Sequence, residues 1–279
     1  MTDTVERIDM IHERVNLRKD NPEIVLDTYV CRDLEGTAPR RAVLVLPGGG
    51  YCLCAHHEGE HIALSYLAAG INAFVLNYST TSNTPDLNYP APLVDASNAM
   101  KYIRDNAERF NIDKDKICVL GFSAGGHLAG MLGTIWHRQE VYDAAEPMEF
   151  GYNKPNGMIL CYAVASAGKF AHRGSFDNLL CGGDSSEAKR EYLSNELNVD
   201  ERTCPAFLWH TSDDTCVPVE NTLLMAGALS ANKIPFEVHI YPHGNHGLGL
   251  PNGDGGFPSI DGAHISTWMP LSIEWIKSL

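Results

Sequence analysis

Short apolar runs alternate along the chain with longer segments in which apolar residues recur at every third or fourth position. The short runs are rich in β-branched residues and predict buried strands, whereas the recurrence in the longer segments predicts helices with one buried face. Strands that alternate with helices form a mostly parallel central sheet with helices on both faces. The predicted strands are 24–30, 42–46, 71–78, 116–120, 158–162, 206–210 and 236–241, and the predicted helices are 61–69, 92–110, 124–137, 219–231 and 267–278.

The chain length of 279 residues suits one α/β domain, 1–279, and an apolar content of 44% is ample for its core. Residues 1–20 are polar and charged, and we expect them to form an N-terminal extension or an edge strand. Two further segments, 138–156 and 163–202, interrupt the alternation of strands and helices. We expect both to be insertions that shape a site.

The formal net charge of −14 argues against nucleic acid and against an anionic membrane as partners. The N-terminus lacks the basic and apolar segments of a secretion signal, and no run of about 18 apolar residues occurs, so we expect a cytoplasmic protein. The eight cysteines are scattered and have no zinc-site spacing, which favours a reduced compartment and predicts no metal.

The first candidate for chemistry is the pentapeptide Gly121-Phe122-Ser123-Ala124-Gly125. It joins the predicted strand 116–120 directly to the predicted helix 124–137. A strand that turns abruptly into a helix holds its corner residue in a strained conformation, and side chains two residues to either side would collide. This context is typical of the nucleophile elbow of an α/β-hydrolase, with Ser123 as the nucleophile.

A serine hydroxyl needs a base and an orienting acid, and in this fold the acid precedes the histidine in the chain. Two aspartates, Asp213 and Asp214, follow the predicted strand 206–210. Asp214 lies in the pattern Asp-x-x-Val-Pro, which is the spacing of the acid in this fold. We therefore predict Asp214 as the acid and Asp213 as a turn or cap residue.

Two histidines follow the next predicted strand, 236–241. His246, which precedes a glycine, is the predicted base, because the loop after the last strand can place it over the nucleophile. His243 is expected to be a loop residue beside the site. His127, four residues after Ser123, is expected to be structural and to bond locally.

Backbone N–H groups must stabilise the oxyanion of the tetrahedral intermediate. One is expected from Ala124, the residue after the nucleophile. The others are expected from Gly49 and Gly50, in the glycine run that follows the predicted strand 42–46, with Gly48 permitting the turn. A phosphate-binding loop is the rival interpretation, but the run lacks the Lys-Ser/Thr of a P-loop.

These motifs together resemble the α/β-hydrolase esterases grouped with acetyl xylan esterases and bacterial feruloyl-esterase-like proteins. The resemblance implies a cofactor-free serine carboxylesterase that acts on short acyl groups, often the acetyl groups of plant-polysaccharide sugars such as xylo-oligosaccharides. The related hormone-sensitive-lipase group differs, because it has His and Arg where this chain has Pro47 and Ser79. The resemblance runs from about residue 24 to the C-terminus and rests on the segments 46–51, 58–60, 121–128, 210–221 and 242–250.

The substrate pocket is expected in the loops that follow the strands. Tyr51 and Tyr89 lie in two of those loops and are candidates for contact with a sugar ring. A general small-molecule carboxylesterase or deacetylase is the main alternative. A peptidase of the prolyl-oligopeptidase type lacks room here for its propeller domain, and a noncatalytic member of the fold would be expected to lack a triad residue.

Overall fold

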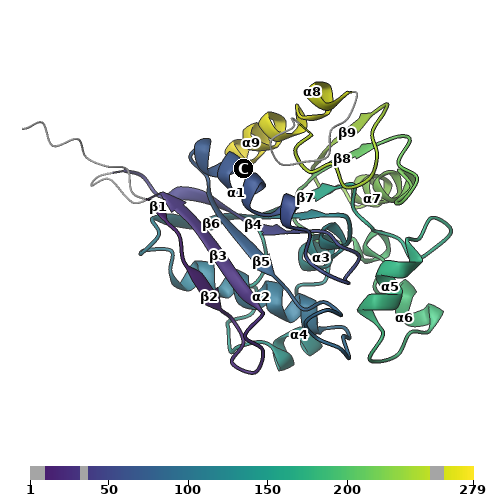
Figure 1. Cartoon of the computed structure of the whole chain (residues 1–279), viewed down its shortest axis with the longest axis horizontal. Helices are drawn as coiled ribbons and strands as arrows, with labels where there is room; N and C mark the ends of the chain where they lie inside the picture. Colours follow the sequence, from purple (N-terminus) through teal and green to yellow (C-terminus); the bar gives the residue numbers. More distant parts are fainter. Residues whose placement is uncertain (1–9, 32–36, 252–260) are drawn as a thin grey trace, which may run out of the picture.

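The structure is a computed structural model, and it describes residues 10–31, 37–251 and 261–279. Its sheet has nine strands in the order β1-β3-β5-β4-β6-β7-β8-β9, with β2 paired to β3 outside this path (Figure 1). The strands are β1 (Met10–Ile11), β2 (Arg14–Asn16), β3 (Val25–Cys31), β4 (Arg40–Leu46), β5 (Asn72–Asn77), β6 (Ile112–Phe122), β7 (Gly157–Cys161), β8 (Ala206–Thr211) and β9 (Phe236–Tyr241).

All pairings from β5 across to β9 are parallel, whereas β1, β2 and β5 pair with β3 in antiparallel fashion. The predicted mostly parallel sheet is therefore confirmed. The helices are α1 (Glu60–Ala68), α2 (Ala91–Asp105), α3 (Ser123–Thr134), α4 (Gln139–Ala144), α5 (Arg173–Leu179), α6 (Glu187–Tyr192), α7 (Glu220–Ala231), α8 (Gly262–Ile265) and α9 (Trp268–Ser278), with short 3-10 turns η1 (His56–Glu58) and η2 (Asn195–Asn198).

The central strands are buried on both faces, which explains why they read as continuous apolar runs. Alternate side chains of β4 point to opposite sides of the sheet. Leu44 and Leu46 pack with α2 and α3, whereas Val43 and Val45 pack with α1 and α9. The sheet is thus the middle of three layers, as Figure 1 shows.

The helix predicted for 92–110 ends earlier, at Asp105, and the following strand begins earlier, at Ile112. The side-chain amide of Asn106 bonds the Tyr102 carbonyl at 2.8 Å and closes the helix end. Arg104 then donates to the carbonyls of Lys114 and Tyr152, which holds the chain as it turns back into β6. The contact with Tyr152 comes from a distant segment, so periodicity within the helix does not reveal it.

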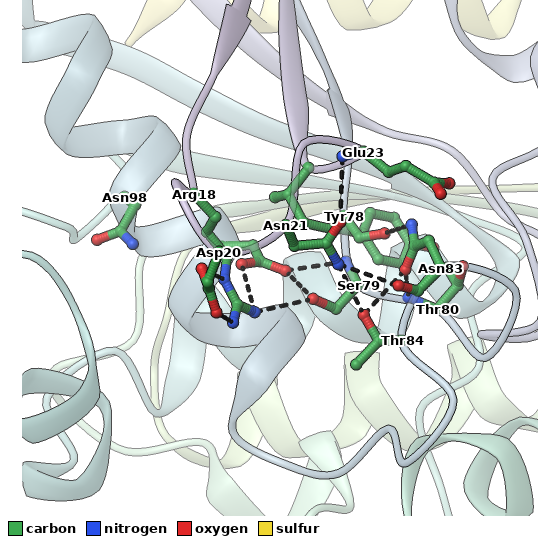
Figure 2. A network of polar contacts seen from close by, with 12 residues as sticks. Arg18, Asp20, Asn21, Glu23, Tyr78, Ser79, Thr80, Asn83, Thr84 and Asn98 are labelled. Atoms are coloured by element: carbon green, nitrogen blue, oxygen red, sulfur yellow. Dashed lines mark hydrogen bonds and ion pairs between the residues drawn. The ribbon is translucent and has the colours of Figure 1, made fainter.

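The segment 10–20 forms β1, β2 and a turn, as expected for an edge strand, and residues 1–9 of the predicted extension lie outside the described residues. Arg18 in this turn reaches Asp20 and the hydroxyl of Ser79, as Figure 2 shows. Arg18 Nη1 also lies 3.8 Å from Oδ1 of Asp95 at the start of α2. Asp95 is fully buried, and its Oδ2 accepts the N–H and the hydroxyl of Ser79 at 2.9 and 2.5 Å.

The two segments expected to shape a site take different positions. Within 163–202, the side-chain amide of Asn178 on α5 donates to the Gly50 carbonyl at 2.9 Å, so this segment reaches the glycine run. The segment 138–156 is instead held against α2, where the N–H of Glu146 bonds Oδ1 of Asn98 at 2.9 Å. Among the described helices, none combines the length and apolar character that crossing a membrane requires.

Candidate active site

Ser123 occupies the turn between β6 and α3 and has a positive φ of 53°, which L-residues rarely adopt. A Cβ on Gly121 would lie 2.0 Å from the Gly125 carbonyl oxygen. A Cβ on Gly125 would lie 2.2 Å from the Leu46 carbonyl oxygen. The collisions expected from the pentapeptide therefore occur, and they explain both glycines.

The structure brings the three predicted triad residues together from the ends of three strands. His246 Nε2 lies 2.8 Å from Ser123 Oγ, and His246 Nδ1 lies 2.7 Å from Asp214 Oδ2. An ionised carboxylate can only accept, so Nδ1 carries the ring proton. Nε2 is then free to accept the proton of the serine hydroxyl, which is the arrangement of a general base.

The turn after β8 fixes the Asp214 carboxylate. Its Oδ1 accepts the backbone N–H groups of Cys216 and Val217 at 2.8 and 2.9 Å. Burial alone would raise the pKa of Asp214, but hydrogen bonds from His210 and His246 hold it well below its usual range. Asp214 is therefore ionised at neutral pH and can stabilise an imidazolium on His246.

The alternative acid and base form a separate pair at the surface. Asp213 Oδ2 lies 3.1 Å from His243 Nδ1, and these side chains are 51% and 65% exposed. Asp213 Oδ1 also accepts the N–H of Gly244 at 2.8 Å, so it holds the loop. The geometry thus agrees with the choice of Asp214 over Asp213 and of His246 over His243.

The glycine run lies against the nucleophile, because a Cβ on Gly48 would come within 3.0 Å of Ser123 Cβ. Gly49 and Gly50 have φ of 122° and 63°. Their carbonyls bond to Cys52 N and Asn178 Nδ2. Within the described part of the chain, no loop or turn hydrogen bond uses the N–H of Gly49 or Gly50.

Ala124 is the second residue of α3, and its N–H has no acceptor within the helix. The three predicted donors, Gly49, Gly50 and Ala124, thus keep backbone N–H groups available for an oxyanion. Their assignment to an oxyanion hole remains a prediction.

Tyr51 and Tyr89 do not take the positions expected of sugar contacts. Tyr51 is fully buried, and its hydroxyl lies 2.9 Å from His127 Nδ1. Tyr89 is 5% exposed, and its hydroxyl donates to Glu140 at 3.0 Å. The interpretation of these tyrosines as sugar contacts is therefore corrected, since their places in loops that follow strands did not reveal which way the rings point.

His127 is structural, as expected, but its contacts are not local. Its Nε2 lies 2.8 Å from the Leu193 carbonyl, which only accepts, so Nε2 donates and Nδ1 accepts from Tyr51. The ring thereby joins α3 to distant segments. Burial lowers the pKa of His127 to about 4.

Sequence reasoning missed several polar residues around the triad. Glu58 is buried behind the glycine run and bonds Gly48 and Tyr162. His172, next to α5, bonds Ser175 Oγ at 2.9 Å. Burial is the main cause that lowers the pKa of His172. Only Glu58 carried a sequence signal, because it belongs to one of the segments that resemble the esterases.

The sequence matches the family described as BD-FAE over residues 26–229. The chain belongs to the BD-FAE family of α/β-hydrolase esterases. No group of three or more His, Cys, Asp or Glu side chains within the described ranges is arranged to hold a metal ion.

Among solved structures, the chain is similar to an acetyl ester-xyloside bifunctional hydrolase from Caldicellulosiruptor lactoaceticus. The identity is 37%, the TM-score is 0.78, and the match covers 99% of this chain and 98% of the other. A carboxylesterase from Lactobacillus plantarum WCFS1 matches with a TM-score of 0.80 at 23% identity, which supports the α/β-hydrolase fold alone.

Two curated relatives carry names from xylan degradation. Endo-1,4-beta-xylanase B of Butyrivibrio fibrisolvens is 41% identical over 213 residues, covering 76% of this chain and 33% of that protein. The acetylxylan esterase of Xylanibacter ruminicola is 30% identical over 215 residues, covering 75% of this chain and 41% of that protein. The chain thus spans less than half the length of either relative.

Proposed function

We propose that this protein is a serine carboxylesterase that removes short acyl groups, above all acetyl, from plant-polysaccharide-derived sugars such as xylo-oligosaccharides. The observation that carries the proposal is the chain of contacts at 2.8 and 2.7 Å that joins Ser123, His246 and Asp214. The substrate class is supported by the relatives named as an acetylxylan esterase and an acetyl ester-xyloside hydrolase.

In the first half of the reaction, Ser123 Oγ attacks the ester carbonyl while its proton passes to His246 Nε2. Asp214 stabilises the imidazolium that results. The carbonyl oxygen becomes an oxyanion, which the N–H groups of Gly49, Gly50 and Ala124 bind. Collapse of the intermediate breaks the bond to the alcohol, which leaves with the proton from His246, and an acyl group remains on Ser123.

In the second half, water replaces the alcohol. His246 takes one proton from the water, and the hydroxide attacks the acyl carbonyl, again with the oxyanion held by the glycine run. The serine leaves with the proton from His246, and the carboxylic acid is released. Apart from the ester and water, the triad and the backbone N–H groups supply every group that these reaction steps use.

Polar groups beside the glycine run support a hydroxylated alcohol such as a sugar. Ser175 Oγ would lie 3.9 Å from a Cβ on Gly50, and His172 bonds the same hydroxyl. Such groups can exchange hydrogen bonds with sugar hydroxyls.

The test is to incubate the protein with acetylated xylo-oligosaccharides and measure released acetate, with Ser123→Ala as the matched control. Acetate release that disappears in the variant is the expected result. An absence of release from xylo-oligosaccharides, with p-nitrophenyl acetate still cleaved, would overturn the sugar substrate and retain the serine esterase. Failure to cleave either ester would overturn the proposed activity itself.

A general small-molecule carboxylesterase is the second candidate. The burial of Tyr51 and Tyr89 favours it, because the two rings expected to stack on a sugar are not available. A panel of acetyl esters of simple alcohols, compared with acetylated xylo-oligosaccharides by kcat/KM, separates the two candidates. A preference for the sugar esters of at least about tenfold, or about 1.4 kcal/mol, is expected from the primary proposal.

A further inference from the structure

The carboxylate of Glu58 lies between the two loops on which the proposed reaction depends. Glu58 ends η1 and is only 2% exposed. Its Oε2 accepts the N–H of Gly48 at 2.7 Å, and its Oε1 accepts the hydroxyl of Tyr162 at 2.5 Å. A buried carboxylate thus holds the start of the glycine run from behind.

Tyr162 continues this connection to the loop that carries His246. Its hydroxyl oxygen accepts the N–H of Gly249 at 2.9 Å, and its ring stands edge-on to the His246 ring with centroids 5.0 Å apart. Tyr162 has a positive φ of 35°, a conformation that persists only where the surroundings enforce it. The tyrosine is therefore fixed at the end of β7 by contacts on both sides.

His57 makes a second connection to the same loop. Its Nε2 lies 2.9 Å from the Gly247 carbonyl oxygen, which only accepts, so the ring donates. The same nitrogen lies 3.7 Å from Glu58 Oε1. His57 thus binds the loop that carries His246 directly, at Gly247, whereas Glu58 reaches it through Tyr162, at Gly249.

We propose that Glu58, acting through Tyr162, is a positioning residue that sets the place of the oxyanion donors relative to His246. The proposal rests on the proposed function. Gly48 transmits the effect, because a Cβ at this position would lie 2.6 Å from Glu58 Oε2 and 3.0 Å from Ser123 Cβ. A shift of Gly48 moves the donors Gly49 and Gly50 relative to the nucleophile. Even a small misplacement of groups that stabilise the transition state reduces the rate strongly.

The second acceptor oxygen of the Glu58 side chain is the feature that the test can isolate. Gly48 N–H and the Tyr162 hydroxyl are both donors here, and a carboxylate accepts from both. A glutamine of nearly the same volume has one acceptor oxygen and one NH₂ donor. Glu58→Gln therefore loses one of the two contacts while the packing is kept.

The experiment compares Glu58→Gln, Tyr162→Phe and the double variant with the wild-type protein on p-nitrophenyl acetate. Rates are divided by the number of serines that a fluorophosphonate labels at completion, so that misfolded protein does not count. We expect each single variant to lower kcat by about tenfold to hundredfold with KM changed by less than about threefold. Because both act through one network, the double variant should be no slower than the slower single variant.

Two matched variants control for the loss of a carboxylate and of a buried hydroxyl. Glu60→Gln changes an exposed neighbour, and Tyr66→Phe removes a buried hydroxyl that lies 2.7 Å from Ser272 Oγ. Both should keep the wild-type kcat per labelled serine. Wild-type kcat in Glu58→Gln, or losses that multiply in the double variant, would overturn the proposal.

The rate of fluorophosphonate labelling of Ser123 keeps this test separate from the choice of substrate. If the wild-type protein cleaves no ester, the proposed function fails, but labelling still reports on the nucleophile and its oxyanion donors. Labelling should then be slower in Glu58→Gln and Tyr162→Phe and unchanged in Glu60→Gln and Tyr66→Phe. Equal labelling rates in all five proteins would overturn the positioning role.

Discussion

Asp214 faces a second imidazole, since its Oδ2 lies 3.3 Å from Nε2 of His210, and both side chains are wholly buried. The same Nε2 lies 2.9 Å from the Val217 carbonyl oxygen, which only accepts, so this nitrogen carries the proton. The other ring nitrogen lies 2.8 Å from the Thr222 hydroxyl. The predicted acid of the triad, Asp214, is thus held by His210 as well as by His246, the histidine that contacts Ser123.

Replacement of His210 by phenylalanine should destabilise the protein and slow the reaction. The Val217 carbonyl loses its buried donor and Asp214 loses the facing N–H, so we expect the free energy of unfolding to fall by about 1–3 kcal/mol in urea titrations. The value of kcat should fall as well. His239→Phe on the adjacent strand, where the ring is partly exposed, is the control and should shift stability by less than about 0.5 kcal/mol.

Two neighbouring aspartates should respond very differently to the same substitution. Asp214→Asn should lower kcat by about three to four orders of magnitude, because the amide cannot hold His246 in the tautomer that accepts from Ser123. Asp213→Asn should leave kcat near the wild-type value, since Asp213 contacts exposed His243 and the Gly244 N–H but not His246. Steady-state rates on p-nitrophenyl acetate measure both effects. A larger loss of kcat in Asp213→Asn than in Asp214→Asn would identify Asp213 as the acid of the triad.

Two buried groups should affect stability in opposite ways as the pH changes. Burial raises the pKa of Asp95 to about 6, so the native state binds its proton more tightly and stability falls as the pH rises from about 4 to 6. Burial lowers the pKa of His127 to about 4, so stability falls as the pH drops from about 6.5 to 4. Each effect is on the order of 3 kcal/mol, and in this shared window they largely cancel.

Asp95→Asn should therefore expose the effect of His127. We expect its free energy of unfolding, measured in urea at intervals from pH 4.5 to 7, to fall steeply on acidification, whereas the wild-type profile stays flatter. Asp143→Asn, which changes an exposed carboxylate on α4, should leave the wild-type slope intact. Parallel profiles for the wild-type and Asp95→Asn proteins would contradict the prediction that Asp95 and His127 affect stability in opposite directions.

Substitution by alanine should lower the stability of the protein at one glycine and raise it at another. Gly125→Ala places a Cβ 2.2 Å from the Leu46 carbonyl oxygen and should lower the melting temperature and abolish ester hydrolysis. Gly227 lies within α7, is exposed, and has nothing within 4 Å of an added Cβ. Gly227→Ala should raise the free energy of unfolding by about 0.5–1 kcal/mol, and a melting temperature below that of the wild-type protein would refute this expectation.

The residues that sequence reasoning placed well are those whose positions follow from alternation. Ser123, Asp214 and His246 each follow a strand of the parallel part of the sheet, and the ends of parallel strands meet at one edge of a sheet. The glycines around Ser123 carried a steric signal, which the close approaches at Gly121 and Gly125 explain. These predictions depend only on strand patterns, turn residues and the order of the residues along the chain, all of which one sequence provides.

The contacts that sequence reasoning missed join segments far apart in the chain. Glu58 meets Tyr162 across 104 positions, and His127 meets Leu193 across 66. A ring such as Tyr51 can follow the glycine run and still turn inward, because its partner is decided by packing. Periodicity and motif spacing carry no information on such pairings, so this part of the site needed coordinates.

The contact between Arg18 and Asp95 bears on how the protein can be re-engineered. Removal of the chain through residue 20 would leave the buried carboxylate of Asp95 without its cation, and an uncompensated buried charge costs several kcal/mol. Asp95 also holds Ser79, where β5 ends on the side of the glycine run. A fusion partner joined at the N-terminal side therefore needs to leave Arg18 in place, so that the turn between β2 and β3 stays bound to α2.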